Sequence, residues 1–235
     1  MGGRQMNGPL LVLDTATRSP VVALADERGE LIGVRQWQSR HRHSEELLER
    51  LDDLLTETGV DRRALGGVIV GTGPGSFTGL RIGLATAKVI AYGLDVPLVA
   101  VSTTLALANA ARKQSGTDRM AVTLPAGASD SYVHLFRADG EDGPPRLVGS
   151  AGDVADTIGD ATLVAVDAQE GAAEEAVERG HQAVARLAAA LAELGSEALA
   201  EGDTADPARL VPAYVALPRG IARAAAEMEW SPDLR

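Results

Sequence analysis

The chain has 235 residues, of which 45% are hydrophobic and 3% aromatic, and it carries a formal net charge of −11. This length allows one large or two smaller domains, and the acidic balance argues against a chain that grips nucleic acid by itself, because phosphate binding needs clustered lysine and arginine. The absence of cysteine excludes disulfides and thiolate nucleophiles, and the lack of a signal peptide or a long apolar run predicts a cytoplasmic protein without a membrane anchor.

The sequence of the first part of the chain predicts three strands, followed by helices and strands in alternation. Short, turn-rich connections join the first three apolar segments, which is typical of antiparallel hairpins. Leucines at helical spacing then predict an amphipathic helix with Ser44 as its N-cap and Gly59 as its C-cap. In chain order the expected elements are strands at 10–13, 21–25 and 31–37, a helix at 44–58, a strand within 65–73, a helix at 77–94 and a strand at 96–103.

The composition changes after about residue 110, where residues 111–119 have the polar composition of a linker or an exposed turn. A first domain of residues 1–108 and a second of residues 109–235 are therefore expected. Prolines at 207, 212 and 218 leave only the last dozen residues of the tail to form a helix. The second domain is expected to contain strands at 120–125, 131–137, 145–150 and 161–167 and an alanine-rich helix at 183–195.

The glycine-rich segment Gly71–Gly79 has three interpretations. A Walker A phosphate loop needs a lysine in register, but Lys88 lies three turns into the following helix. A dinucleotide fingerprint needs a third glycine and a carboxylate that ends the next strand, whereas Ser76 replaces the glycine and Asp95 precedes its strand. The third and favoured interpretation is a structural turn, capped by Ser76 or Thr78, in which glycines permit close backbone approach. It assigns a structural role to Gly71, Gly73, Pro74, Gly75 and Ser76.

The helix at 77–94 is apolar over most of its surface, with polar side chains on one narrow stripe. Gly79, Gly83 and Ala87 form a row of small residues that would let another helix approach closely. The helix is therefore predicted to be covered on a second side, either by another subunit or by the chain's own second domain, and the pattern leaves both open. If another subunit covers it, Gly83→Leu blocks assembly and leaves the monomer folded.

Candidate catalytic and metal-binding residues are few. Asp14 ends the first strand in a hydroxyl-rich hairpin, where a Mg²⁺–phosphate turn and an Asx turn are the alternatives and the Asx turn is favoured. His41 and His43 precede the first helix without further metal ligands near them in the sequence, which favours an exposed helix start. No catalytic residue and no metal site are predicted.

Three segments resemble the TsaB (YeaZ) family: "LLVLDTATRSPVVAL", "RHSEELLERLDDLL" and "GTGPGSFTGLRIGLATAKVIAYGLDVPLVAVSTTLALA". The third contains the family signature Gly-x-Gly-Pro-Gly-Ser-Phe-Thr-Gly-Leu-Arg-Ile-Gly without interruption from Gly71 to Gly83. The resemblance covers most of residues 10–108 and is weak afterwards, where only "PAYVALPRGIA" is similar to the family's Pro-x-Tyr motif.

This resemblance implies an α/β protein of the actin-like ATPase fold (sugar kinase, Hsp70 and actin; ribonuclease H-like), with two lobes that each hold a mixed sheet flanked by helices. It implies a role in making threonylcarbamoyladenosine in tRNAs that read ANN codons. The family member is a scaffold and not the catalyst. It forms a heterodimer with the ATP- and metal-binding TsaD transferase, the complex recruits the TsaE ATPase, and the chain alone forms a homodimer. Contact with tRNA is indirect, no cofactor of its own is expected, and ATP or ADP at a subunit junction is left open.

In the family the interface is formed by two helices of the first lobe. The residues assigned to it here are Ser44, Leu47, Leu48, Leu51, Phe77, Thr78, Gly79, Leu80, Arg81, Gly83 and Ala87. The loop at 124–132 departs from the family, because "PAGASDS" lacks the usual Asp and Arg. Neither this loop nor "VDAQEG" supplies a second phosphate hairpin or an adenosine loop. The alternatives, an actin-fold ATP-dependent phosphotransferase for a small metabolite and a dinucleotide-binding enzyme, are therefore less favoured than the scaffold.

Overall fold

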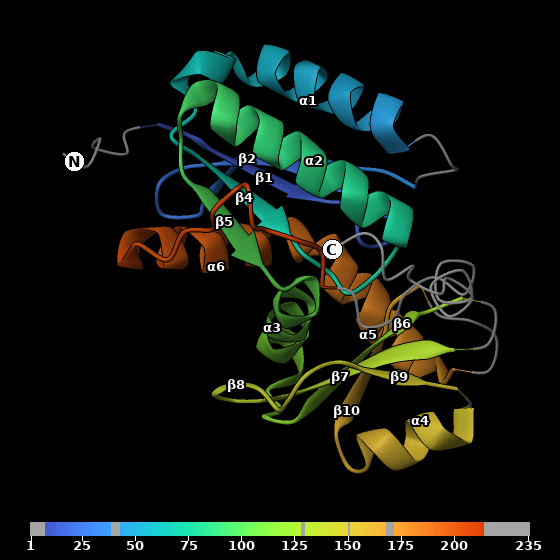
Figure 1. The fold of residues 1–235 in the computed structure, drawn as a ribbon. Helices are drawn as coiled ribbons and strands as arrows, with labels where there is room; N and C mark the ends of the chain where they lie inside the picture. Colours follow the sequence, from blue (N-terminus) through green and yellow to red (C-terminus); the bar gives the residue numbers. More distant parts are fainter. Residues whose placement is uncertain (1–7, 39–42, 128–129, 150, 168–171, 214–235) are drawn as a thin grey trace, which may run out of the picture.

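The computed structural model of the chain describes residues 8–38, 43–127, 130–149, 151–167 and 172–213, with only the backbone described at 43–45. It contains two mixed sheets, one from each half of the chain, with helices between them and on their outer faces (Figure 1). Within the described residues, no helix combines the length and the apolar character needed to cross a bilayer.

The first sheet has the strand order β3-β2-β1-β4-β5, in which the first three strands form an antiparallel meander and the last two run parallel to β1. The predicted hairpins and the helical crossovers after them are confirmed. The elements are β1 Leu10–Asp14, β2 Val21–Ala25, β3 Leu31–Gln36, α1 His43–Thr58, η1 Arg62–Ala64, β4 Gly67–Gly71, α2 Phe77–Leu94 and β5 Leu98–Val101. This is the topology of the actin-like, ribonuclease H-like fold.

Both faces of the first sheet are covered, which explains why its central strands are continuous apolar runs. Successive side chains of β1 project to opposite faces. Leu11 and Leu13 pack beneath α1 and α2, whereas Leu10 and Val12 pack toward α6 (Leu187–Glu201) on the other side. Every residue of β1, β2 and β4 is buried, and the edge strand β3 is largely exposed.

The second sheet has the order β10-β6-β7-β8, and β9 also pairs with β7. Strands β6 and β10 are parallel, while β7 is antiparallel to its neighbours. The four strands predicted in this half are confirmed, and the two-residue β8 is an addition. The elements are β6 Met120–Pro125, β7 Ser131–Arg137, β8 Gly140–Glu141, β9 Arg146–Val148, α4 Ala151–Ile158, β10 Thr162–Ala165 and α5 Glu174–Ala185.

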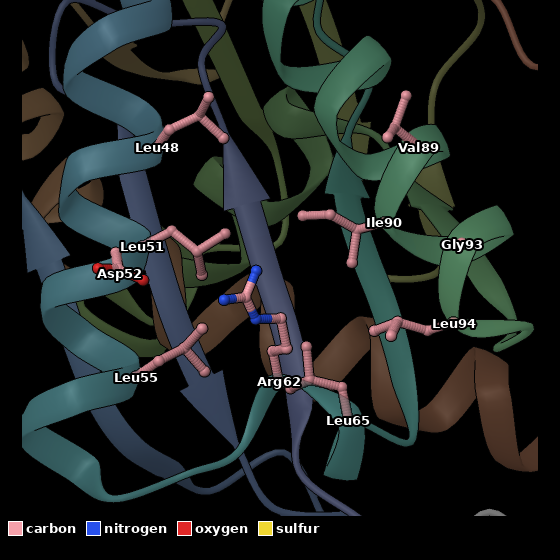
Figure 2. Close-up of a pocket in the computed structure, with 10 residues that line it drawn as sticks. All are labelled: Leu48, Leu51, Asp52, Leu55, Arg62, Leu65, Val89, Ile90, Gly93 and Leu94. Carbon is pink, nitrogen blue, oxygen red and sulfur yellow. The ribbon is translucent and has the colours of Figure 1, made fainter.

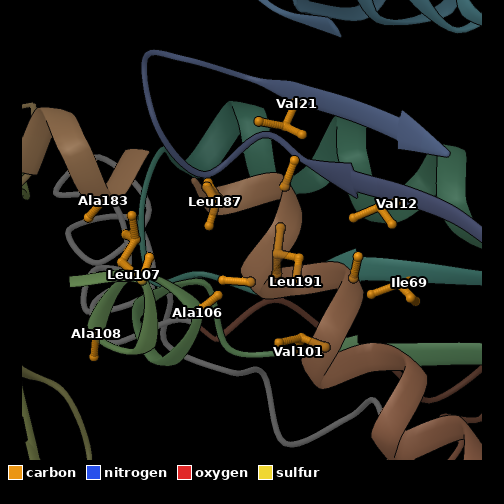
Figure 3. Close-up of a cluster of buried hydrophobic side chains, with 14 of the residues drawn as sticks. Val12, Val21, Ile69, Val101, Ala106, Leu107, Ala108, Ala183, Leu187 and Leu191 are labelled. Atoms are coloured by element: carbon orange, nitrogen blue, oxygen red, sulfur yellow. The ribbon is translucent and has the colours of Figure 1, made fainter. Parts of the chain in front are cut away.

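Helix α3, Thr103–Ser115, lies between the sheets and was not among the predicted elements. The prediction of a linker in this region is wrong for residues 111–115, which form the last turn of the helix. Ser102 caps the helix by accepting the backbone N–H of Leu105 at 3.3 Å, and Gly116 ends it with a left-handed φ of 65°. Its apolar face packs with α5, α6 and the first sheet in one buried cluster (Figure 3).

Helix α6 follows α5 after a break at Arg186 and packs on the first sheet. The single alanine-rich helix predicted at 183–195 is thus divided between the end of α5 and α6. Close approach to the sheet requires glycine, because a Cβ on Gly195 would lie 2.5 Å from Cδ1 of Ile69 on β4. The division of the chain into domains after residue 108 stays a prediction.

After α6 the chain returns along the outer edge of β5. The backbone N–H of Ala205 donates to the Leu98 carbonyl at 2.7 Å, and that of Ala213 donates to the Thr72 carbonyl at 3.0 Å. Leu210 packs against the apolar cluster beneath α1 and α2. The last described residues therefore reach the loop that precedes α2. The Tyr of the Pro-x-Tyr motif and the helix predicted in the last dozen residues lie outside the described residues.

Gly195→Ala is expected to lower the free energy of unfolding by about 1–3 kcal/mol, because the added methyl group overlaps Ile69 in a packed core. Gly93→Ala is the matched control, since it also replaces a helical glycine but a Cβ there meets no atom within 4 Å. It is expected to raise the free energy of unfolding by about 0.5–1 kcal/mol. Urea denaturation measures both changes, and equal effects at the two positions would contradict this packing.

Candidate functional site

Helices α1 and α2 lie side by side on one face of the first sheet (Figure 1). α1 begins at His43, so the predicted cap Ser44 falls one residue inside the helix, and its side chain lies outside the described residues. The helix ends as predicted before Gly59, which has a left-handed φ of 67°. His41 and the side chain of His43 also lie outside the described residues.

The glycine-rich loop before α2 (residues 71–76) is held by hydrogen bonds within the chain. The backbone N–H of Gly73 donates to Thr103 Oγ1 at 3.0 Å, and that of Ser76 donates to the Ala16 carbonyl at 2.7 Å. Because these N–H groups already donate to acceptors within the chain, they are not available to bind a phosphate group. Of the two predicted caps, Ser76 is the N-cap of α2, and its hydroxyl accepts the N–H of Gly79 at 3.2 Å.

Glycine is required in this loop because it passes close to the β1–β2 connection (residues 15–20). A Cβ on Gly71 would overlap the Asp14 carboxylate, and one on Gly75 would overlap a carbonyl oxygen of the connection. Gly73 has a φ of 90°, which side chains disfavour, and Pro74 beside it is buried. These contacts are those of a structural turn.

The row of small residues on α2 faces the same connection. Thr15 Oγ1 donates to the Gly79 carbonyl at 2.7 Å, and a Cβ on Gly83 would overlap that hydroxyl. Ala87 continues the row and is fully buried over the sheet. The prediction that this row admits a helix of another subunit is wrong, because the chain's own hairpin occupies the space.

The other predicted interface residues divide into a buried and an exposed set. The buried set is Leu47, Leu51 and Leu80, and the exposed set is Leu48, Thr78 and Arg81. Phe77 is half-buried, and the Arg81 guanidinium lies 4.9 Å from the centre of its ring. Contact between these residues and a partner stays a prediction.

One exposed apolar residue of α2, Val89, was missed from the sequence, whereas Tyr92 belongs to the polar stripe predicted on this helix. Val89 is 71% exposed and Tyr92 is 84% exposed. Val89 stands about 200° around the helix from both Ala87 and Ala91, which are buried, and this angular offset is the signal that could have identified it. The apolar character of α2 therefore extends beyond the face that the sheet covers.

A groove of about 520 Å³ separates α1 from α2. Figure 2 shows Leu51 and Ile90 pointing toward each other from the two helices, with Arg62 and Leu65 at one end. Asp52 and Arg62 are the charged members of an otherwise apolar lining. The lining residues are Leu48, Leu51, Asp52, Leu55, Arg62, Leu65, Val89, Ile90, Gly93 and Leu94.

A buried carboxylate joins β1 to the glycine-rich loop. Asp14 is fully buried; its Oδ1 accepts the Ala16 N–H at 2.8 Å, and its Oδ2 accepts the Thr103 hydroxyl at 2.6 Å. The first of these bonds is the predicted Asx turn. Burial raises the pKa of Asp14 to about 6, against the lowering effect of the two hydrogen bonds. Within the described residues, no three His, Asp or Glu side chains are placed to hold a metal ion together.

Asp167, which follows β10, had no signal in the sequence. It has a left-handed φ of 51°, and its Oδ2 accepts the backbone N–H of Arg18 at 2.7 Å, which links the two halves of the chain. Burial raises the pKa of Asp167, while this hydrogen bond and the charges of Arg18 and His181 act in the opposite direction. Carboxylates perturbed by burial are frequent at functional sites, but Asp14 and Asp167 are both engaged in bonds that hold the fold together.

The chain is similar to proteins of one family. The family model described as "TsaD: tRNA N6-adenosine threonylcarbamoyltransferase" matches residues 32–192. The tRNA threonylcarbamoyladenosine biosynthesis protein TsaB of Escherichia coli is 30% identical over 130 residues, 55% of each chain. The protein of the same name from Haemophilus influenzae is 32% identical over 126 residues, 54% of this chain and 52% of that one. The structure of YeaZ from Pseudomonas aeruginosa matches with a TM-score of 0.68 and 26% identity, covering 88% of this chain and 99% of that one.

The chain belongs to this TsaD family, on its TsaB (YeaZ) branch. It spans about half the length of the curated TsaB relatives it matches. The TsaB signature from Gly71 to Gly83 coincides with the loop and the first turns of α2 that lie against the β1–β2 connection. In this chain the signature is therefore a packing motif.

Gly83→Leu is expected to destabilise the monomer by at least about 2–3 kcal/mol, because the side chain would have to displace Thr15 from a closely packed contact. Thermal unfolding of the purified variant measures this. Ala85→Leu is the control, since Ala85 is an exposed position of the same helix, and its unfolding temperature is expected to stay close to that of the wild type. A Gly83→Leu monomer of unchanged stability would restore the interpretation of this row as an interface.

Asp14 is expected to make the fold less stable as the pH rises. Its pKa is about 6 in the folded chain and 3.8 in a solvated state, so the folded chain binds this proton more tightly. The resulting stabilisation is fully present below about pH 4 and is lost as the pH rises through about 6, a change of about 3 kcal/mol. The free energy of unfolding of Asp14→Asn relative to the wild type is therefore expected to increase by up to about 3 kcal/mol between about pH 4 and pH 7.5.

Thr103→Val tests the cause of this behaviour. Loss of the hydroxyl removes a bond that lowers the pKa of Asp14, so the pH range in which stability falls is expected to move upward. Urea denaturation across this pH range measures both variants. A difference between Asp14→Asn and the wild type that does not change with pH would show that Asp14 does not titrate there.

Proposed function

We propose that the chain is a non-catalytic subunit of the enzyme complex that makes threonylcarbamoyladenosine in tRNAs reading ANN codons. Its direct partner is a TsaD-type transferase, which it binds through α1 and α2 and thereby activates. The proposal is supported by the relatives named tRNA threonylcarbamoyladenosine biosynthesis protein TsaB and by the match to the family of the transferase.

The observation that carries the proposal is the apolar surface of α1 and α2. Leu48, Val89 and Tyr92 are 57%, 71% and 84% exposed, and Leu48 and Val89 line the groove between the helices (Figure 2). Burying one large apolar side chain contributes roughly 1.5–3 kcal/mol, so covering this surface would supply several kcal/mol to an association. A partner of related fold presents an equivalent helix pair, and ridges of one pair can pack into the grooves of the other.

The internal bonds of the glycine-rich loop favour a scaffold over the alternative phosphotransferase. A catalyst of this fold needs backbone N–H groups and a carboxylate that can face a nucleotide. Here the N–H groups of Gly73 and Ser76 bond within the chain, and both oxygens of Asp14 do the same. The subunit thus brings no catalytic cofactor of its own, and ATP or ADP used by the complex binds at a junction with the partner.

The proposal includes a homodimer, a TsaE-type ATPase and an indirect contact with tRNA. In the absence of the transferase, a second copy of the chain covers α1 and α2 and gives a homodimer. A TsaE-type ATPase joins the heterodimer. The net charge of −11 makes the chain a poor ligand for a polyanion, so tRNA is held by the partner and contacts this subunit only indirectly.

Reconstitution of the modification reaction tests the proposal. The chain is combined with the TsaD-type and TsaE-type proteins of the same source, their substrates and unmodified tRNA, and threonylcarbamoyladenosine is measured by mass spectrometry of the digested tRNA. Product is expected only when the chain is present. Val89→Glu is expected to reduce product formation and affinity for the transferase at least about tenfold, because a carboxylate without a partner is costly to bury.

Leu147→Glu is the matched control for Val89→Glu. Leu147 is a 44% exposed residue of β9, on the second sheet, and its substitution is expected to leave both product and affinity unchanged. Both variants should unfold close to the wild-type temperature, because each replaces an exposed side chain. Isothermal titration with the transferase separates lost assembly from lost chemistry. Product formation without the chain, or full activity of Val89→Glu, would overturn the proposal.

A further inference from the structure

A buried histidine connects the second sheet to the start of α3. His134 lies on β7, and its side chain is 2% exposed. Helix α3 packs beside this strand, between the two sheets (Figure 1). Both ring nitrogens have partners, because Nδ1 lies 2.7 Å from the Thr104 hydroxyl and Nε2 lies 3.1 Å from the Gly143 carbonyl oxygen. The imidazole therefore bridges α3 and the connection between β8 and β9.

These two partners determine which nitrogen of His134 carries the proton. A carbonyl oxygen can only accept a hydrogen bond, so Nε2–H donates to Gly143. Nδ1 of the neutral ring then accepts the hydroxyl proton of Thr104. Thr104 Oγ1 also lies 3.2 Å from the hydroxyl of Ser102, the N-cap of α3, and accepts its proton. A chain of hydroxyl groups thus runs from the helix cap to the imidazole.

The first turn of α3 is bonded to both halves of the chain. Thr104 contacts His134 of the second sheet. The preceding residue, Thr103, donates to Asp14 Oδ2 of the first sheet at 2.6 Å and accepts the Gly73 N–H at 3.0 Å. Because the two threonines are consecutive in one helical turn, a change at His134 is close to the contacts that hold the loop before α2.

The surroundings of His134 favour a neutral ring. Burial lowers the pKa of His134 below its ordinary value of 6.5, while Glu141 and the Gly143 carbonyl act in the opposite direction. Glu141 Oε2 lies 3.7 Å from Nε2, but this carboxylate is 43% exposed, so solvent screens its charge. Strand β6 contributes no titratable group. The other charged or titratable side chains of the elements around the ring are Tyr132 and Arg137 on β7, Asp139 and Asp142 on either side of β8, Arg146 on β9, and Arg112 and Lys113 on α3.

We propose that proton uptake by His134 weakens the contact between the second sheet and α3, so that the His134–Thr104 contact is a pH-sensitive joint between the two halves of the chain. A proton on Nδ1 turns this atom from an acceptor into a donor. Thr104 then accepts, its own proton turns toward Ser102, and the hydroxyl chain reverses. The proton also places a positive charge among buried groups, which is costly without a close counter-ion. This joint goes beyond the proposed assembly role and is tested on the isolated chain.

NMR titration of His134 tests the protonation state on which the proposal depends. Long-range proton–nitrogen correlation spectra report which imidazole nitrogen is protonated, and the signal of His134 is identified by its loss in His134→Gln. The Nε2–H form is expected at about pH 7.5, with a midpoint of proton uptake below 6.5. Glu141→Gln is expected to lower the midpoint further, because it removes a charge that favours the imidazolium. Glu197→Gln is the matched control, since Glu197 is an exposed carboxylate of α6, and it should leave the midpoint unchanged.

Amide hydrogen exchange tests whether the joint loosens in mild acid. Wild type and His134→Gln are compared at each pH, so that the intrinsic pH dependence of exchange and the titration of Asp14 are common to both. Relative to this variant, exchange in the first turn of α3 of the wild type is expected to rise at least about threefold between about pH 7.5 and pH 5, because the opened state takes up a proton that the closed state disfavours.

His134→Asn replaces the glutamine variant if that variant does not fold. The proposal is overturned by an Nδ1–H ring at about pH 7.5 or by a midpoint at or above 6.5. It is also overturned if the ratio of exchange rates between the wild type and the variant is the same at both pH values, because a purely structural role of His134 gives a constant ratio.

Discussion

The close contact between α2 and the β1–β2 connection is the constraint on which the rest of the structure depends. Thr15 lies against Gly79 and Gly83, where neither position has room for a Cβ, and its hydroxyl donates to the Gly79 carbonyl. Asp14 extends this contact by accepting the Thr103 hydroxyl at the start of α3. Strand β1, the glycine-rich loop and two helices are thereby fixed relative to one another, because closely packed interiors transmit such restrictions.

This contact decides which face of α2 remains outside. The small residues of α2 pack against the chain's own hairpin and sheet. The side chains of α2 that face away from the sheet are larger and partly apolar. Val89 on α2 and Leu48 on α1 stand on either side of a groove that the described residues leave open. A helix that is apolar on more than one side thus serves two contacts, one inside the molecule and one that we assign to a partner.

The polar groups between the two halves of the chain also bond to one another. A nucleotide-binding protein of this fold would direct backbone N–H groups and a carboxylate toward phosphates. Here Gly73, Thr103 and Asp14 form a chain of hydrogen bonds among themselves. The carboxylate still carries an electrostatic penalty, seen in its raised pKa, and hydrogen bonds from neighbours offset part of it. The same groups therefore stabilise a rigid core.

Much of the fold could be predicted because its signals are local. The hairpins, the buried strands, the Ser76 cap and the helix at 77–94 follow from apolar periodicity and from turn and cap residues within a few positions. Helix α3 was missed because its polar final turn, residues 111–115, has the composition of a linker, and only packing against α5 and α6 shows that the turn continues a buried helix.

The candidate site likewise has features that the sequence alone predicts and features that depend on the tertiary structure. The sequence by itself determined that the Gly79, Gly83 and Ala87 row needs a close neighbour, because the absence of large side chains is a property of the residues alone. Only the tertiary structure decided that the neighbour is Thr15 of the same chain and left Val89 exposed. It likewise brought Asp167 to the backbone of Arg18. The residues of one segment determine that it needs a close neighbour. Which segment becomes that neighbour depends on contacts between residues far apart in the chain, and a local sequence pattern does not specify such contacts.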